Sequence, residues 1–161
     1  MGLPLRRRLH APTFLLANII VDIEPFLVLI LGLRYPLHGY LHTFLLAVPV
    51  GFLLGYLMFL LERVLQPLYK MLMLEKNGGL CLKRFLLAGG LGTCLHVLFD
   101  APLYSDMRPF YPSTANPLYN PSLTPEIYGL CVWTGALGTA YYITLAGLSI
   151  YRRLSKKKVE R

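Results

Sequence analysis

The sequence is poor in charged residues, and acidic residues are the scarcest of these. Only 15% of its 161 residues are charged, with 8 Asp and Glu against 16 Lys and Arg, while 55% are hydrophobic and the mean hydropathy is +0.53. A soluble domain of this size usually has fewer apolar and more charged residues. We therefore expect a single integral membrane domain over residues 1–161.

Cysteine is also scarce. The three cysteines, Cys81, Cys94 and Cys131, lie in or beside apolar stretches and show no CxxC spacing. This pattern excludes both a zinc ribbon and a disulfide framework, so we interpret the cysteines as small packing residues.

The net charge of +8 does not indicate a nucleic-acid partner. The basic residues cluster at the two termini and in one connection, next to apolar segments. That placement suits anionic lipid headgroups and the control of membrane topology.

Four apolar stretches are long enough to cross a hydrocarbon core, which takes about 20 helical residues. They cover about 12–33, 40–61, 82–103 and 126–151. We predict an all-α, polytopic membrane helix bundle. The first stretch has no evident cleavage site, so we expect it to stay in the mature protein. Pro25 lacks a backbone donor and disfavours helix in the residue before it, so the first helix should be broken nearby.

The distribution of Lys and Arg predicts the orientation. Basic residues are numerous before the first stretch, between the second and third, and in the tail, whereas only Arg34 and Arg108 fall in the other two connections. By the positive-inside rule, both termini and the middle connection are cytoplasmic in a plasma or inner membrane. The proline-rich loop of about 104–125 then faces outward.

The four histidines form a pattern with the few acidic residues. Because an ionisable group inside a membrane is costly, such residues indicate a functional site. Helical residues four apart share a face, so each His-x3-His or His-x3-Asp pair can present two ligands to one point. The residues expected to meet toward the outer side are His38, His42, His96 and Asp100, joined by Asp22 and Glu24 at the break.

His10 does not fit this arrangement simply. A straight helix would place it roughly 18 Å from Asp22, at a rise of about 1.5 Å per residue. It reaches the others only if the N-terminal segment is re-entrant. His10 as a ligand is left open.

Imidazole and carboxylate ligands favour a divalent metal, zinc first and manganese or iron as alternatives. The alternative is a hydrogen-bonded polar network that only joins helices.

The ordered motifs resemble those of the YdjM family of membrane-bound, metal-dependent hydrolases. The resemblance covers about residues 10–112 and includes an N-terminal histidine, an acidic pair, a His-x3-His before a hydroxyl residue, and a His-x3-Asp before a proline-containing loop. Two features depart from the family pattern. Glu24 stands where the family has a second aspartate, and the residues between His38 and His42 are apolar. The longer carboxylate either changes the metal geometry or acts as a base.

A more distant likeness is to zinc-dependent phospholipase C, which is helical and binds a zinc cluster. That likeness implies His10 as a ligand, Asp100 as a metal-bridging carboxylate, and a phosphoester substrate. It is an analogy of fold, so the function has to be argued from the site.

These resemblances imply metal-assisted hydrolysis of a phosphoester or related bond in a lipid or lipid-linked substrate. Glu24 or Asp22 would accept the proton from water. Arg108, and second Arg34, would bind an anionic headgroup, or else they are interfacial anchors. The loop of about 104–125 has the length of a lid or binding element.

Two other classes of function stay open from the sequence. Buried His and Asp residues also relay metal ions or protons in transporters. The metal could equally be structural in a non-catalytic membrane protein. The sequence does not decide whether the chain forms a homo-oligomer.

Overall fold

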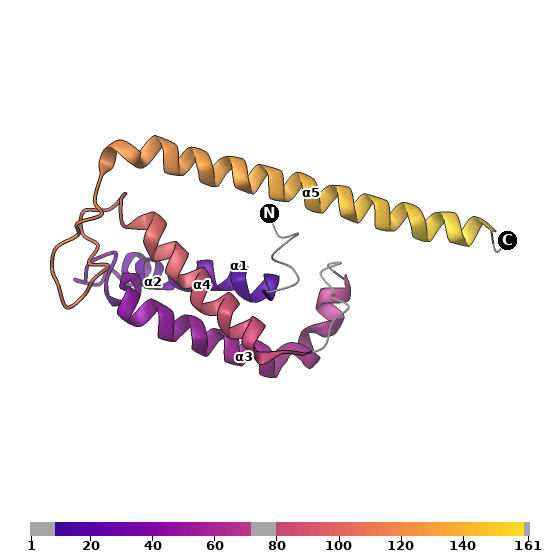
Figure 1. The fold of residues 1–161 in the computed structure, drawn as a ribbon, viewed down its shortest axis with the longest axis horizontal. Coiled ribbons are helices and arrows are strands. Elements are labelled where there is room, and N and C mark those ends of the chain that lie inside the picture. The colour runs from indigo at the N-terminus through magenta and orange to yellow at the C-terminus, as the bar shows by residue number, and fades with distance from the viewer. Residues whose placement is uncertain (1–8, 72–79, 160–161) are drawn as a thin grey trace. The chain divides into compact units, whose positions relative to one another are not determined.

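The described part of the chain, residues 9–71 and 80–159 of a computed structural model, is helical and contains no strand (Figure 1). This confirms the predicted all-α fold class. The elements are α1 (Ala11–Ile20), α2 (Ile23–Leu31), the 3-10 turn η2 (Tyr40–His42), α3 (Phe44–Met71), α4 (Leu82–Asp100), the 3-10 turn η3 (Pro121–Leu123) and α5 (Thr124–Val159).

Three segments are long and apolar enough to cross a membrane: Ala11–Leu31, Phe44–Met71 and Leu82–Asp100. They correspond to the first three predicted spans and indicate a membrane protein. The fourth prediction, 126–151, falls on the long helix α5, which is not among the candidate spans of the described residues. Several Gly, Thr and Tyr residues lower the mean hydropathy of α5.

The predicted orientation rests partly on basic residues that lie outside the described residues. These are Arg6, Arg7, Arg8, Lys76 and Arg161.

The chain divides into two compact units. Among the described residues, 9–71 and 80–124 belong to one unit, and α5 from Pro125 onward belongs to the other. The prediction of one integral membrane domain over residues 1–161 stays a prediction. All the predicted site residues belong to the first unit.

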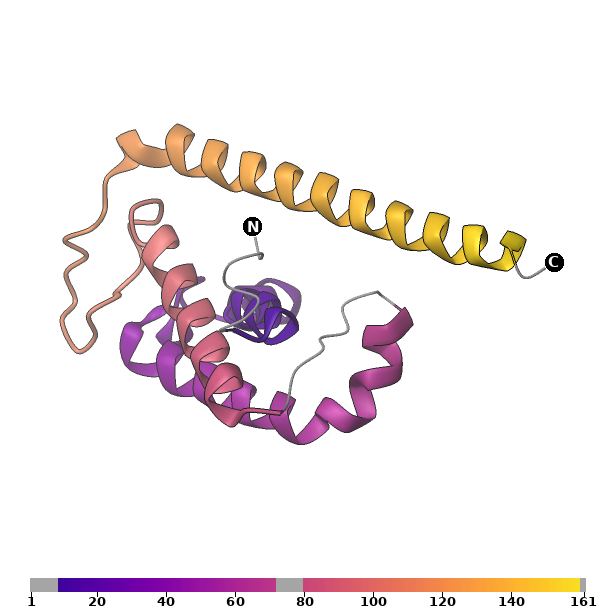
Figure 2. The same ribbon diagram turned by 45° about the vertical axis from the view of Figure 1, so that its right-hand side comes forward.

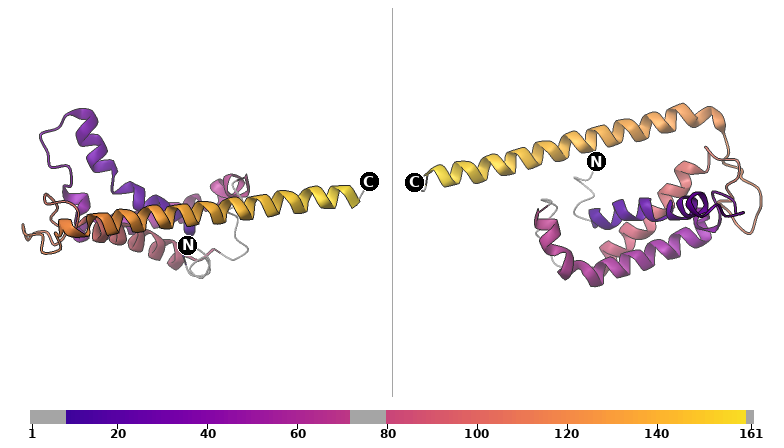
Figure 3. Two further views of the ribbon diagram at one scale, coloured as in Figure 1. Left: turned by 90° about the horizontal axis from the view of Figure 1, so that it is seen from above. Right: turned by 180° about the vertical axis from the view of Figure 1, so that it is seen from behind.

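The first span is broken, as its sequence predicts. α1 ends at Ile20, and α2 begins at Ile23, with a turn at Val21 and Asp22 between them. Pro25 lies in the first turn of α2, where a backbone N–H has no intrahelical acceptor, so the helix starts before the proline at no loss of hydrogen bonding. The break therefore falls three residues before Pro25, at Asp22. Figure 3 shows that α2 points away from the α3–α4 pair.

Glycines allow α3 and α4 to pack with their backbones in contact. A Cβ added at Gly89 of α4 would collide with the carbonyl oxygen of Gly51, and one added at Gly55 of α3 would lie 2.5 Å from the carbonyl oxygen of Phe85. Small residues at helix crossings allow this approach in membranes, where dispersion contacts replace the hydrophobic effect. Figure 2 shows α4 crossing α3, with α1 beside it.

α1 lies along α4 in the same direction. The backbone N–H of His10 donates to the carbonyl of Arg84 (3.4 Å), and a Cβ on Gly92 would meet the Cβ of Ala17 at 2.6 Å. At the far end, Val21 and Val97 are both fully buried in one apolar cluster with Ala47. The turn after α1 is thereby held against the last turns of α4.

The close approach at Gly89 gives a stability prediction. Gly89→Ala should lower the free energy of unfolding by about 1–3 kcal/mol, because overpacking forces the two backbones apart. The measurement is thermal unfolding of the purified protein in detergent micelles.

Gly135→Ala provides the matched control, because a Cβ there meets nothing within 4 Å. Alanine is the better helix former, so this variant should be neutral or slightly more stable. Equal melting temperatures for the two variants would contradict the packing described for α3 and α4.

Candidate metal centre

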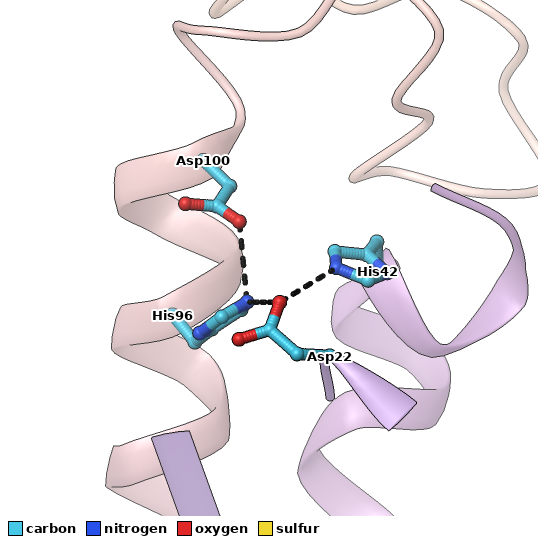
Figure 4. A group of neighbouring side chains, drawn as sticks. All are labelled: Asp22, His42, His96 and Asp100. Carbon is cyan, nitrogen blue, oxygen red and sulfur yellow. Dashed lines mark ion pairs between the residues drawn. The ribbon is translucent and has the colours of Figure 1, made fainter. Parts of the chain in front are cut away.

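Four acidic and histidine side chains from three separate segments converge at one end of the α1, α3 and α4 group. They are Asp22 in the turn after α1, His42 at the end of η2, and His96 and Asp100 on α4 (Figure 4). Each residue offers one ligand atom, and these atoms all lie within 4.8 Å of one another. This group could hold a metal ion.

Asp22 stands between the two histidines. Its Oδ1 atom lies 3.3 Å from Nε2 of His96 and 4.0 Å from Nε2 of His42. Nε2 of His96 is also 3.1 Å from Oδ2 of Asp100. His96 and Asp100 lie four residues apart on α4. The prediction that this His-x3-Asp pair shares one helix face is confirmed.

The chemistry of these donors fits a divalent metal. Nε2 of His42 is buried and has no hydrogen-bond partner among the described residues, and the printed contacts of Nε2 of His96 are with the carboxylates of Asp22 and Asp100. Two imidazoles and two carboxylates suit zinc, and also manganese or iron. Ligands on opposite sides of an ion with bonds of about 2.1 Å stand at most about 4.2 Å apart. The cluster therefore needs only a small contraction to bind one ion, whose identity the donor set does not determine.

Glu24 holds His42 in place from behind. Its Oε2 atom lies 3.1 Å from Nδ1 of His42 and also accepts from the backbone N–H of Leu41 (3.1 Å). A hydrogen bond on Nδ1 leaves the Nε2 lone pair free for a metal, as in the carboxylate–histidine–metal arrangement. Glu24 is therefore placed to orient His42, and its predicted role as a base stays a prediction.

Tyr35 completes the support of Glu24. Its hydroxyl donates to Oε1 of Glu24 (3.1 Å) and accepts from the backbone N–H of Tyr40 (3.1 Å). Burial, together with the carboxylate of Glu24, raises the pKa of the Tyr35 phenol, so the phenol stays a proton donor. The spacing in the sequence gave no sign of this role for Tyr35.

His38 lies outside the four-residue group. α3 begins only at Phe44, so His38 is in the preceding loop and the helical spacing assumed for His38 and His42 does not exist. Nδ1 of His38 lies 2.9 Å from Oδ1 of Asp106. Burial of Asp106 disfavours its charge, but the hydrogen bonds from His38 prevail and lower the pKa of that carboxyl.

His38 nevertheless borders the centre. Its ring meets that of His42 edge-on, with centroids 4.8 Å apart, and stacks on Tyr104 at 4.1 Å. Asp106, which the sequence analysis missed, is one of only 8 acidic residues, but no motif spacing connects it to His38.

His10 occupies a different place. It caps α1 by accepting from the backbone N–H of Thr13 (3.4 Å), and it stacks on Phe85 at a centroid distance of 4.1 Å. Its Nε2 atom lies 3.4 Å from Oε2 of Glu62. Phe85 precedes His96 by eleven residues of α4, or about 16 Å. Among the described residues, the length of α1 thus separates His10 from the metal cluster, and His10 as a ligand stays a prediction.

Arg34 and Arg108, the predicted headgroup ligands, are both exposed. Arg34 is in the loop between α2 and η2. Arg108 lies in the loop after α4, between the fully buried side chains of Met107 and Pro109. Their binding of a substrate stays a prediction.

No protein-family model matches the chain, and no curated protein or solved structure matches it either. The site is therefore interpreted from its own geometry.

The support of His42 by Glu24 can be tested by metal binding. Glu24→Gln removes the charge that orients and polarises His42, and should weaken zinc affinity by about 10- to 100-fold. The affinity is measured by competition with a chromogenic chelator in detergent.

Asp106→Asn is the matched control, since it also neutralises a carboxylate bonded to a histidine, but one outside the cluster. Its zinc affinity should stay within about threefold of the original, because second-layer effects act through a bound ligand. Equal losses in the two variants would contradict the separate roles assigned to Glu24 and Asp106.

Proposed function

We propose that this chain is a membrane-embedded, metal-dependent hydrolase. The observation that carries the proposal is the convergence of Asp22, His42, His96 and Asp100 on one point, with their ligand atoms within 4.8 Å of one another, at the break of the first candidate span, the start of the second and the end of the third. The buried Nε2 atom of His42 needs a partner that the described residues do not supply, and a metal would provide it.

The uneven burial of the ligands favours catalysis over a structural metal. The side chain of His42 is 0% exposed, whereas that of Asp22 is 57% exposed. Structural zinc sites are closed by four protein ligands, while catalytic sites keep a position open. An exposed, displaceable carboxylate at Asp22 leaves such a position. This argues against a purely structural role.

A divalent ion at this centre would supply a Lewis acid that lowers the pKa of water toward neutrality and polarises a phosphoryl oxygen. The residues have separate tasks around it. His42 and His96 hold the ion through Nε2, with Glu24 fixing the ring of His42. Asp22, the exposed carboxylate, is the group placed to accept a proton from the attacking water, since Glu24 is fully engaged.

The substrate class follows from the resemblance and the setting. The likeness to the YdjM family and the more distant likeness to zinc-dependent phospholipase C both support a phosphoester or related bond. The three apolar helices support a lipid or lipid-linked substrate. In this proposal Arg34 and Arg108 contact the anionic headgroup, both termini are cytoplasmic, and the centre faces outward.

The competing transporter function is less well supported by the packing. A transporter needs polar groups on a route through the membrane. Between the metal cluster and the contact of His10 with Glu62, α1 and α4 contribute the uncharged polar side chains of Thr13, Asn18 and Thr93 but no acidic, basic or histidine side chain. An ion route along this pair of helices would therefore lack an ionisable relay group between its two ends.

Hydrolysis gives the direct test of this proposal. The purified chain loaded with zinc should release phosphate from phosphatidic acid in mixed micelles, and a chelator should abolish the release until zinc is restored. His96→Ala should lower the rate by more than about 100-fold, because even the partners of metal ligands contribute 10- to 100-fold. Phosphate release is followed colorimetrically.

Cys131→Ser, an exposed position in α5, controls for purification and reconstitution and should keep the full rate. Bound zinc without release from any phosphate ester, lipid or soluble, would favour a structural metal instead.

A further inference from the structure

The exposed carboxylate of Asp22 lies in an apolar stripe. Ile19, Ile23 and Phe26 are 61%, 46% and 61% exposed, and Asp22 falls among them at spacings of three and four residues. Ile19 lies at the end of α1, and Ile23 and Phe26 lie on α2, so these exposed apolar residues flank the turn at Asp22 on both sides. We call Ile19, Asp22, Ile23 and Phe26 the portal stripe.

This position is unusual for a charged group in a membrane segment. Asp22 is near the middle of the span Ala11–Leu31, where an unpaired charge facing lipid is costly. One side of its carboxylate faces His96 and His42, while more than half of the side chain is open to the surroundings. The carboxylate therefore connects the metal cluster with the lipid-facing surface.

The loop after α4 lies over the start of α3, at the same end of the helices as the metal cluster. Asp106 accepts from the backbone N–H of His38 (3.2 Å), and the carbonyl of Pro109 accepts from the backbone N–H of Phe44 (2.9 Å). Met107 is fully buried in the apolar cluster beneath the centre. These contacts hold this part of the loop over the start of α3. The proposed route of entry at Asp22 does not require the loop to move.

We propose that the substrate is a membrane lipid with a terminal phosphate group, of the kind found in phosphatidic acid, that enters sideways at Asp22. Its headgroup reaches the metal cluster past that exposed carboxylate, and its apolar chain lies along Ile19, Ile23 and Phe26. This inference rests on the proposed function, because it takes the metal cluster as the reacting centre. It adds the route of entry and the residues that contact the chain.

Photolabelling tests the route without requiring turnover. The zinc-loaded chain is placed in phosphatidylcholine vesicles that contain phosphatidic acid with a diazirine in its acyl chain, and labelled residues are mapped by mass spectrometry. Labels should be enriched at Ile23 and Phe26 over Leu53, an apolar residue of α3 that is 59% exposed. The enrichment should be about tenfold, as for a specific over a nonspecific lipid contact, and should disappear when zinc is removed.

Diazirine phosphatidylcholine is the parallel probe, because it should label the stripe and Leu53 alike. Equal labelling of the portal stripe by both lipids would overturn the proposed route. Absence of labelling by either lipid would also overturn it, because it would mean that protein covers the stripe. If soluble phosphate esters are cleaved while the stripe shows no enrichment, the hydrolase proposal survives and the lateral route fails. If the stripe is enriched but nothing is cleaved, the route stands and the hydrolase proposal fails.

A charge substitution gives a second, kinetic readout. Phe26→Glu places a charge where the apolar chain of the lipid should lie and should raise KM for phosphatidic acid about tenfold, with little change for soluble p-nitrophenyl phosphate. Leu53→Glu introduces the same charge at a similarly exposed apolar position and should leave both KM values unchanged. Equal effects of the two variants on phosphatidic acid would contradict the route.

Discussion

The arrangement of the centre depends on one contact, that between Glu24 and Nδ1 of His42. Glu24 belongs to the first turn of α2, and His42 belongs to the turn that precedes α3. Their contact of 3.1 Å therefore joins the broken first span to the start of the second. It also directs the Nε2 atom of His42 toward Asp22 and His96. The hydrogen bonds of His38 to Asp106 anchor the same end of the loop between α2 and η2 from the other side.

The break in the first span makes this contact possible. In a continuous helix from Ala11 to Leu31, Asp22 and Glu24 would point about 200° apart, given about 100° per residue. The turn at Val21 and Asp22 instead lets Asp22 face His96 while Glu24 reaches His42. Irregular backbone at membrane depth is tolerated where it is buried or lines a cavity. Here it lies against the last turns of α4, through the packing of Val21 on Val97.

Close helix packing positions α4 so that His96 and Asp100 lie beside Asp22 and His42. The glycine contact of Gly89 with Gly51 fixes α4 on α3, and Gly92 against Ala17 fixes α1 on α4. His96 and Asp100 follow one and two turns later on α4. The glycines and the metal cluster are therefore parts of one framework, although no glycine touches the cluster.

The sequence allowed the helical class, the first three spans and the break to be predicted, because each rests on local composition or on proline. The pairing of His96 with Asp100 was predictable for the same reason, since both lie within one regular helix. The structure does not bring His38 and His10 into this group of four, because their places depend on where α3 starts and on which part of α4 lies beside each end of α1. Local spacing contains neither piece of information. The roles of Tyr35 and Asp106 arise from loops that meet only in the fold.

X-ray absorption at the zinc edge tests the central claim, that Asp22, His42, His96 and Asp100 form a metal centre. The zinc-loaded protein should bind one equivalent and show only nitrogen and oxygen neighbours at about 2.0–2.1 Å, with the multiple scattering of two imidazoles. His42→Ala should reduce the imidazole count by one, whereas His10→Ala should leave it unchanged. Sulfur neighbours at about 2.3 Å, or a spectrum unaltered by His42→Ala, would show that the metal binds elsewhere and would contradict this account.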